Sequence, residues 1–167
     1  MKIIVLSCDK NEDLFEPFHH CMEKYWENHP EVIYYTESII NPYYKTICVS
    51  RELSEWTKGT REFLKQIDDD VVLLMMDDLF IRKPVDEVRL MRTAMYMRVS
   101  VEHHGNIALF NLEQSWDKND EQSCFEGFKK RRHGSQYEVS IMCGIWDKRK
   151  LMNVMSADTD PWQIEYQ

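Results

Sequence analysis

Glycine and proline are both scarce in this chain, with five of each among 167 residues. No Gly/Pro-rich stretch separates one part of the sequence from another, and neither an internal repeat nor a low-complexity tract is present. These absences argue against a flexible interdomain linker and against a repeat architecture. We therefore predict a single domain spanning residues 1–167, a length sufficient to bury a hydrophobic core.

The cysteines are too few and too irregularly spaced for a metal-binding or disulfide framework. Five are present, an odd number, and no CxxC pair occurs among them. The His19-His20 and His103-His104 pairs also lack the spacing of metal ligands. This pattern argues against a zinc ribbon and a disulfide-rich fold, and it favours reduced thiols.

Long hydrophobic runs are missing as well. No stretch approaches the roughly 18 apolar residues of a membrane span. The sequence opens on a strand-like segment, MKIIVLSC, which has neither the apolar region nor the small-residue cleavage site of a secretion signal. Together with the unpaired cysteines, these features lead us to expect a cytoplasmic protein without a membrane span.

Positively charged residues are outnumbered in this chain. It contains 21 Lys and Arg but 29 Asp and Glu, which gives a formal net charge of −8. Sequence-independent binding of nucleic acid requires a broad basic face, so nucleic acid is an unfavoured partner, although it is not excluded. One local exception is the basic cluster KKRRH at residues 129–133. We interpret it as a solvated loop, with contact to phosphate groups as the alternative.

The apolar residues that are present alternate between strand-like and helix-like segments. Short runs rich in β-branched and aromatic residues predict strands, and apolar positions at helical spacing predict amphipathic helices. This alternation is typical of an α/β fold with a mainly parallel sheet. Residues 113–138 are polar, with few periodic apolar positions, and are predicted to be loop that includes a flap. The predicted strands are 2–7, 32–36, 46–49, 71–76, 99–102 and 107–112, and residues 141–146 form a further apolar segment. The predicted helices are 14–27, 54–67 (Ser54 as N-cap; Trp56, Phe63, Leu64 and Ile67 facing inward), 84–98 and 148–155.

The most informative chemical feature is the segment VVLLMMDDLF at residues 71–80, where six apolar residues end at Asp77 and Asp78. Ligands of open parallel sheets bind at the carboxyl ends of the strands, and Asp9 follows the first predicted strand to the same edge. Two adjacent carboxylates are costly to desolvate unless a cation neutralises them, and oxygen ligands suit Mg²⁺ or Mn²⁺, which in turn hold phosphates. We predict a metal site here; the alternative is an ordinary acidic turn.

Four segments, in order, resemble a family of small glycosyltransferases of the GT-A fold, found in bacterial surface-polysaccharide loci and in phages. They are VLSCDKNEDLFEPF (5–18), WTKGTREFLKQIDDDVVLLMMDDLFIRKPVD (56–86), GIWDKRKL (144–151) and DPWQIE (160–165). Each segment is short, but the ordered set runs over nearly the whole chain. The resemblance implies a Rossmann-like α/β/α sandwich in which residues 1–98 bind a nucleotide-sugar donor and residues 99–167 bind the acceptor.

The resemblance also implies roles for single residues. In such enzymes an acidic pair after the fourth strand, often written DxD, binds a divalent ion, Mn²⁺ or Mg²⁺, on the donor diphosphate. Here the pair reads Asp77-Asp78 without a spaced second aspartate. Either both acids touch the metal, or Asp78 does so while Asp77 contacts the ribose or sugar; a weak or absent metal site is also open. Asp9 would lie near the nucleoside, and Arg61 either near the diphosphate or in a surface ion pair.

An inverting sugar transfer needs a carboxylate base that takes the proton from the acceptor hydroxyl. In the DPWQIE segment, Glu165 is the first candidate for this base and Asp160 the second, with Trp162 stacked on a sugar of the acceptor. The alternative is that Trp162 packs onto the core and Glu165 is solvated. Trp146 is predicted to be a core residue because apolar residues accompany it.

Three functional hypotheses follow from these patterns. The leading one is a metal-assisted glycosyltransferase that moves a sugar from a nucleotide-sugar donor to a hydroxyl of a glycan, a lipid-linked saccharide or, in a phage, a modified base. A metal-dependent nucleotidyltransferase or phosphohydrolase ranks lower, because Cys8-Asp9-Lys10 lacks the glycines of a phosphate loop. A binding module that kept the fold and lost transfer is the third. The short chain also favours a compact acceptor half, completed by a homodimer or another partner.

Overall fold

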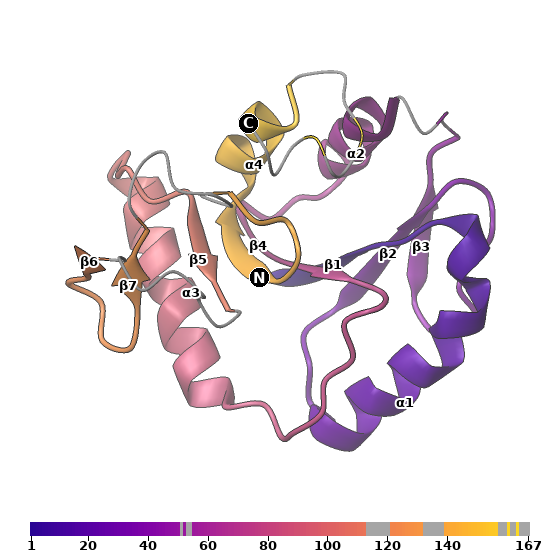
Figure 1. The fold of residues 1–167 in the computed structure, drawn as a ribbon, viewed down its shortest axis with the longest axis horizontal. Coiled ribbons are helices and arrows are strands. Elements are labelled where there is room, and N and C mark those ends of the chain that lie inside the picture. The colour runs from indigo at the N-terminus through magenta and orange to yellow at the C-terminus, as the bar shows by residue number, and fades with distance from the viewer. Residues whose placement is uncertain are drawn as a thin grey trace.

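The computed structural model describes residues 1–50, 52, 55–112, 121–131, 139–156, 160 and 163. In this part of the chain, a six-stranded sheet with the order β3-β2-β1-β4-β8-β5 forms the middle layer, and helices cover both of its faces (Figure 1). A two-stranded sheet, β6-β7, lies on the β5 side of the molecule. The elements are β1 (Lys2–Leu6), the 3-10 helix η1 (Asp9–Leu14), α1 (Phe15–Tyr25), β2 (Val32–Thr36), β3 (Lys45–Cys48), α2 (Trp56–Leu64), β4 (Val71–Met76), α3 (Glu87–Glu102), β5 (Leu109–Asn111), β6 (Glu121–Gln122), β7 (Lys129–Lys130), β8 (Gly144–Asp147) and α4 (Lys148–Val154).

Four neighbouring strands form the parallel part of the large sheet. β1 lies between β2 and β4, with Ile4 opposite Ile33 on one side and Leu74 on the other. All of β2 and nearly all of β4 are buried, as expected where helices cover both faces of parallel strands. β8 runs antiparallel to both β4 and β5, so the sheet is mostly parallel with one reversed strand.

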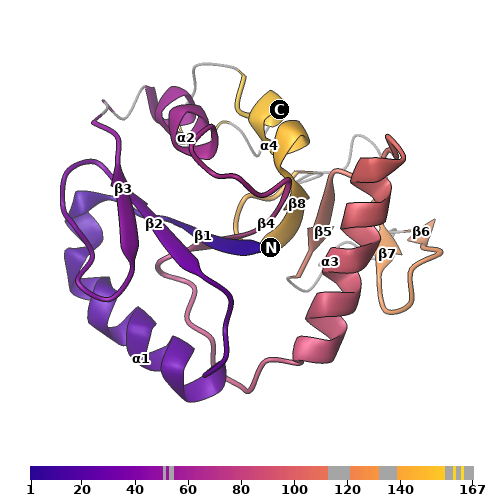
Figure 2. The ribbon, with the colours of Figure 1, turned by 180° about the vertical axis from the view of Figure 1, so that it is seen from behind.

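Two hydrophobic cores fill the spaces between the sheet and the helices. Alternate strand residues point to opposite faces. Val5 and Leu73 therefore pack into the core that α1 and α3 cover, whereas Ile4 and Leu74 pack into the core that α2 and α4 cover. Figure 2 shows α2 and α4 together on one side of the sheet and α1 on the other. The fold is the three-layer α/β/α sandwich that the sequence predicts.

The core positions predicted from helical spacing are confirmed. Trp56, Phe63, Leu64 and Ile67 are each at most 3% exposed, and Trp146 is 1% exposed. The predicted N-cap, Ser54, lies outside the described residues. No helix in the described part of the chain is long and apolar enough to cross a membrane.

Two local predictions are wrong. Residues 99–102, predicted as a strand, form the last turn of α3, because packing against β8 and β4 outweighs the strand preference of two valines. The chain leaves this helix where His104 adopts a positive φ of 52° and the Gly105 N–H donates to the Ser100 carbonyl. Within the predicted loop 113–138, β6 and β7 form an antiparallel hairpin, so part of the basic cluster is strand.

Candidate functional site

The candidate site lies at the carboxyl ends of β1 and β4, where the register places Leu6 opposite Met76 and thus Ser7 beside Asp77. The Ser7 hydroxyl donates to Asp77 Oδ2 at 2.5 Å, and the Asn11 amide donates to Asp77 Oδ1 at 3.1 Å. Asp77 is 2% exposed. Residues from two adjacent strand ends therefore hold one buried carboxylate in a fixed orientation.

The electrostatic state of Asp77 reflects competing effects. Burial raises the pKa of its carboxyl above the ordinary value, the hydrogen bonds from Ser7 and Asn11 act in the opposite direction, and the neighbouring charge of Asp78 raises it further. A carboxylate in this position gains stabilisation from any cation that approaches the strand end, because a positive charge offsets both the burial and the repulsion.

Asp78 is the exposed member of the pair. It lies in the turn that follows β4, where the Leu79 N–H donates to the Met76 carbonyl at 3.2 Å. Mg²⁺ and Mn²⁺ are often held by only one or two carboxylates together with water and substrate phosphates, so Asp78 with Asp77 behind it fits such an ion. Among the described residues no group of three or more His, Cys, Asp and Glu side chains is placed to hold a metal. The phosphate oxygens of a ligand would therefore have to complete the coordination.

Asp9 lies at the same edge, in η1, but its carboxylate is already occupied. Its Oδ1 accepts hydrogen bonds from the backbone N–H groups of Glu37, Ser38 and Ile39 at 3.0–3.2 Å, and the Ser38 hydroxyl donates to its Oδ2 at 2.5 Å. Burial opposes ionisation of Asp9, but these hydrogen bonds outweigh it and lower the pKa to about 2. Asp9 thus ties the loop after β2 to the loop after β1, which shapes the edge.

Arg61 comes from a different element than the aspartates. It is in the last turn of α2, the helix on the opposite sheet face from the core lined by β1 and β4 residues Val5 and Leu73. Its Nε is buried and has no hydrogen-bond partner among the described residues. A contact of Arg61 with a donor diphosphate stays a prediction.

The C-terminal candidates are only partly described. Asp160 is described, and its Oδ1 accepts a hydrogen bond from the Gln163 N–H at 2.9 Å, a geometry that favours a helical turn. Glu165 and Trp162 lie outside the described residues. The structure therefore brings Asp9, Asp77 and Asp78 to one edge, and the roles assigned to the C-terminal segment stay predictions.

Two residues that hold this site were not singled out for it from the sequence. Ser7 and Asn11 position Asp77, yet nothing in their immediate sequence marks them as partners of a residue about 70 positions away. The strand order is what predicts this contact. When β1 and β4 are neighbours in a parallel sheet, the residues that follow the two strands lie close together.

Comparison with solved structures identifies the fold. The galactosyltransferase LgtC, in complex with donor and acceptor sugar analogues, superposes with a TM-score of 0.56 over 92% of this chain and 60% of that chain, at 14% identity. The protein has the GT-A fold. Two further structures match with lower TM-scores. An active-site mutant of LgtC has a TM-score of 0.40 at 14% identity, over 53% of this chain and 41% of that chain. The bifunctional IspDF from Campylobacter jejuni has a TM-score of 0.45 at 10% identity, over 99% of this chain and 46% of that chain.

The chain is shorter than the proteins it matches, spanning 41% and 60% of the two LgtC chains. No protein-family model and no curated protein sequence matches it. The similarity therefore lies in the arrangement of strands and helices rather than in the sequence.

Proposed function

We propose that this GT-A protein is a glycosyltransferase that moves a sugar from a nucleotide-sugar donor to a hydroxyl acceptor with the help of Mn²⁺ or Mg²⁺. The observation that carries the proposal is the acidic pair after β4: a buried Asp77 held by Ser7 and Asn11, followed by an exposed Asp78. A turn with only a structural role would not need a buried carboxylate that two donors hold in place and whose pKa is raised.

Each aspartate has a separate task in this proposal. Asp78 binds the divalent ion together with the donor diphosphate, and Asp77 either shares the ion or accepts a hydrogen bond from a ribose or sugar hydroxyl. When bound, the ion neutralises negative charge that develops on the departing nucleoside diphosphate. Asp9 acts at the nucleoside end by fixing the two loops between which the base would lie.

The acceptor side belongs to residues 99–167 in this proposal. Glu165 is the candidate base that removes the proton from the acceptor hydroxyl, Asp160 is the second candidate, and Trp162 stacks on an acceptor sugar. The base needs no unusual pKa for this task if the acceptor hydroxyl loses its proton only as the bond to the sugar forms.

The proposal is tested by a thermal-shift screen of UDP-, GDP-, ADP-, CMP- and dTDP-sugars, each with Mn²⁺, Mg²⁺ or EDTA. A ligand that binds the native state raises its apparent stability, so we expect one nucleotide to raise the melting temperature selectively and EDTA to abolish the effect. Release of free sugar and nucleoside diphosphate from that donor would then separate an enzyme from a module that only binds. If no donor shifts the melting temperature with either metal, the proposal fails.

A further inference from the structure

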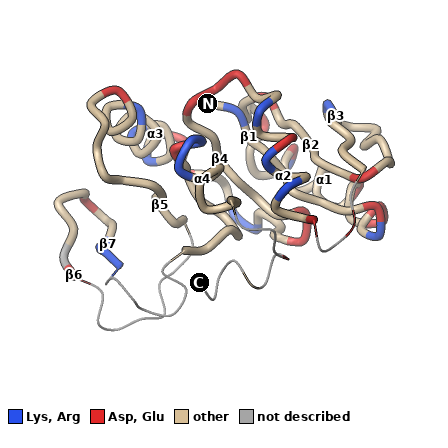
Figure 3. The backbone as a smooth tube through the Cα atoms, turned by 90° about the horizontal axis from the view of Figure 1, so that it is seen from above, with Lys and Arg blue, Asp and Glu red and all other residues tan. Residues whose placement is uncertain are grey.

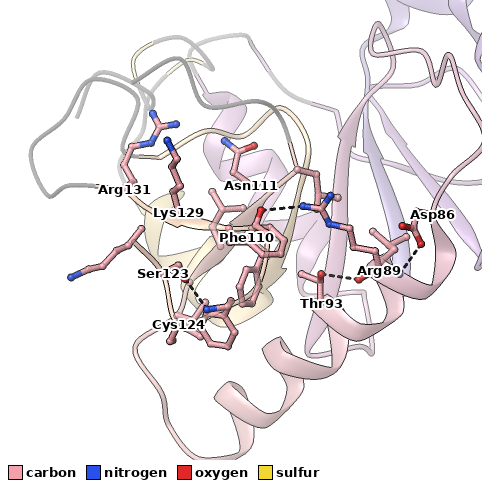
Figure 4. Close-up of a pocket in the computed structure, with 18 of the residues that line it drawn as sticks. Asp86, Arg89, Thr93, Phe110, Asn111, Ser123, Cys124, Lys129 and Arg131 are labelled. Atoms are coloured by element: carbon pink, nitrogen blue, oxygen red, sulfur yellow. Dashed lines mark hydrogen bonds between the residues drawn. The ribbon is translucent and has the colours of Figure 1, made fainter. Parts of the chain in front are cut away.

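A large cavity lies outside the proposed donor site. Its volume is about 1160 Å³, and it lies open to solvent between the first turns of α3, the edge strand β5 and the β6-β7 hairpin (Figure 4). Pockets of about 300–1,000 Å³ hold ligands of the size of a drug or cofactor, so this one has room for a substantial molecule.

The floor of this cavity is apolar. Leu90 of α3 and Phe110 of β5 are 7% and 5% exposed. The rings of Phe125 and Phe128 have their centroids 5.1 Å and 5.0 Å from that of Phe110, and both are only half-buried. The floor therefore offers ring surface against which an apolar or planar group of a ligand is favourably buried.

Three cationic side chains surround the floor. Lys129 and Arg131 are two residues apart, which places them on the same side of the chain at β7, and Figure 4 shows them side by side. Lys130 alternates to the other side and pairs with Glu121 at 3.6 Å. Arg89 reaches in from α3, where it donates to the Gly127 carbonyl at 3.1 Å and lies 5.5 Å from the ring centroid of Phe128. These contacts fix the guanidinium over the cavity.

The charge of this lining is opposite to that of the whole chain. Of the described residues that line the cavity, four are Lys or Arg and one is acidic, Asp86, in a chain with a net charge of −8. Asp86 has a structural task, since its carboxylate caps α3 by accepting a hydrogen bond from the Arg89 N–H at 3.0 Å. Figure 3 shows the basic β7 segment at the margin of the molecule. Clustered Lys and Arg side chains of this kind recognise phosphate groups.

Part of the cavity lining lies on the sheet face that also bears Asp77. Phe110 belongs to the core covered by α1 and α3, as do the β4 residues Leu73 and Met75, which alternate in register with Asp77. Asn111, which lines the cavity, is opposite Gly144 and thereby level with Leu74. Asp77 lies three residues further along β4 than Leu74, and β5 is two strands away from β4. These two displacements put the Cα atoms of Asn111 and Asp77 roughly 14 Å apart. A molecule in the cavity could thus extend to the acidic pair.

We infer that this cavity, between α3, β5 and the β6-β7 hairpin, binds a phosphate or diphosphate group attached to an apolar body, and that this amphiphilic anion is the acceptor. The phosphate contacts Lys129, Arg131 and Arg89, and the apolar body covers the phenylalanine floor. The role as acceptor rests on the proposed function; the binding site itself does not.

Binding is tested on the whole protein by titration calorimetry in EDTA, which removes metal-dependent binding of diphosphate at Asp78. The probes are geranyl diphosphate, p-nitrophenyl phosphate and inorganic pyrophosphate. Because the floor adds apolar burial, geranyl diphosphate or p-nitrophenyl phosphate should bind at least roughly tenfold more tightly than pyrophosphate. The tighter of the two tells an isoprenoid body from an aromatic one. If neither binds more tightly than pyrophosphate, the inference is overturned.

Variants separate the cavity from general electrostatic attraction. The double variant Lys129→Ala/Arg131→Ala should weaken binding of the preferred probe by roughly tenfold or more, because charged hydrogen bonds to phosphate are lost. Arg98→Ala is the control: it removes one charge from α3 at an exposed residue that does not line the cavity, and it should change the affinity less than about twofold. Equal losses in both proteins would contradict a specific site.

The alkylation rate of a cysteine reports binding in the cavity independently of the net charge of the protein. Cys124 lines the cavity and is exposed, while Cys48 is exposed on β3, at the far edge of the sheet. The preferred probe should slow alkylation of Cys124, measured by peptide mass spectrometry, and leave that of Cys48 unchanged. Equal protection of both cysteines, or of neither, would count against binding in the cavity.

The outcome also separates this inference from the proposed function. If the probe binds in the cavity but no nucleotide-sugar stabilises the protein, the binding site stands and its role as acceptor site falls. If a nucleotide-sugar binds with metal but no probe protects Cys124, the transferase proposal stands and the anionic acceptor is rejected.

Discussion

At the scale of single residues, the division between Asp77 and Asp78 follows from one step along the chain. Asp77 follows directly on the buried strand β4 and is itself buried, and Asp78, the next residue, is exposed to solvent. The buried residue is held by Ser7 and Asn11, so it supplies a fixed negative potential rather than a mobile ligand. The exposed residue is the one that a hydrated ion can reach without first being stripped of all its water.

Asp78→Asn should weaken metal-dependent donor binding by about tenfold or more, because an amide oxygen carries no charge to offset the divalent ion. The melting temperature without ligand should stay nearly the same, since exposed substitutions of this kind change stability by at most about 0.5 kcal/mol. The measurement is a thermal-shift titration with the donor identified by the screen, in Mn²⁺. Asp70→Asn, an exposed aspartate at the opposite end of β4, is the control. Wild-type affinity in Asp78→Asn would remove Asp78 from the metal site.

Asp9→Asn should lower the free energy of unfolding at pH 7 by about 1 kcal/mol. The pKa of folded Asp9 is about 2, below the ordinary value of 3.8, so its ionised form stabilises the folded state above pH 3.8. That stability is lost as the pH falls toward 2. The full difference corresponds to at most about 2.5 kcal/mol, and screening by solvent reduces it to about half.

Urea unfolding of wild type and Asp9→Asn between pH 7 and pH 2.5 measures this effect. The difference between the two proteins should be largest at neutral pH and should shrink below pH 4. Asp13→Asn, an exposed acid in the same 3-10 helix, is the matched control and should differ little from wild type. A difference between Asp9→Asn and wild type that does not change with pH would show that the carboxylate charge is not the cause.

At the scale of elements, Asp147 joins β8 to α4. It ends β8 and caps α4 by accepting hydrogen bonds from the N–H groups of Arg149 and Lys150 at 3.0 and 3.3 Å. It is 1% exposed, and the Lys150 ammonium lies 3.6 Å from its Oδ2. A helix of seven residues has little stability of its own, so this cap and the packing of Leu151 determine whether α4 forms.

Asp147→Ala should lower the free energy of unfolding by about 2 kcal/mol, because it removes the N-cap and leaves Lys150 without its carboxylate partner. Asp147→Asn should cost less, since an amide oxygen still accepts the two hydrogen bonds. Urea unfolding followed by circular dichroism measures both values. An equal loss in the two variants would mean that the charge, not the cap, provides the stability.

α3 shows how an element can be predicted while its orientation is not. The apolar spacing in residues 84–98 predicts a helix, and the helix is present. Its core face, however, consists of Leu90, Ala94 and Met97, while Val88, Met91, Met95 and Val99 are 49–80% exposed on the opposite face. Both faces are apolar, so periodicity alone does not say which one the sheet covers.

At the scale of the whole molecule, the sequence predicts the layers better than the site. The uninterrupted apolar run of β4 and the alternation of segments are enough to predict a mostly parallel sheet with Asp77 and Asp78 at its edge. Local sequence does not contain the register that brings Ser7 to Asp77, nor the reversed position of β8 between β4 and β5. The cavity was missed because it depends on a hairpin whose strands are only two residues long, too short for a periodic signal.

The two proposed functional halves, residues 1–98 and 99–167, share one sheet. β8 belongs to the second half and pairs with β4 of the first through four residue pairs. Ile3 of β1 and Ile145 of β8 lie in the same hydrophobic core. A half without the other would leave the edge of β4 unpaired and expose both cores, so neither half can be stable by itself.

The chain should therefore unfold in a single cooperative transition. Ile3→Val and Ile145→Val each remove one methylene from a side chain that is 0% exposed, and each should lower the free energy of unfolding by about 1 kcal/mol. Because the halves share a core, both variants should shift the same transition, with coincident curves from circular dichroism and tryptophan fluorescence. Val88→Ala, at a residue 80% exposed on α3, should leave the midpoint nearly unchanged. Two separate transitions, of which Ile145→Val moves only one, would show instead that the acceptor half folds as a unit of its own.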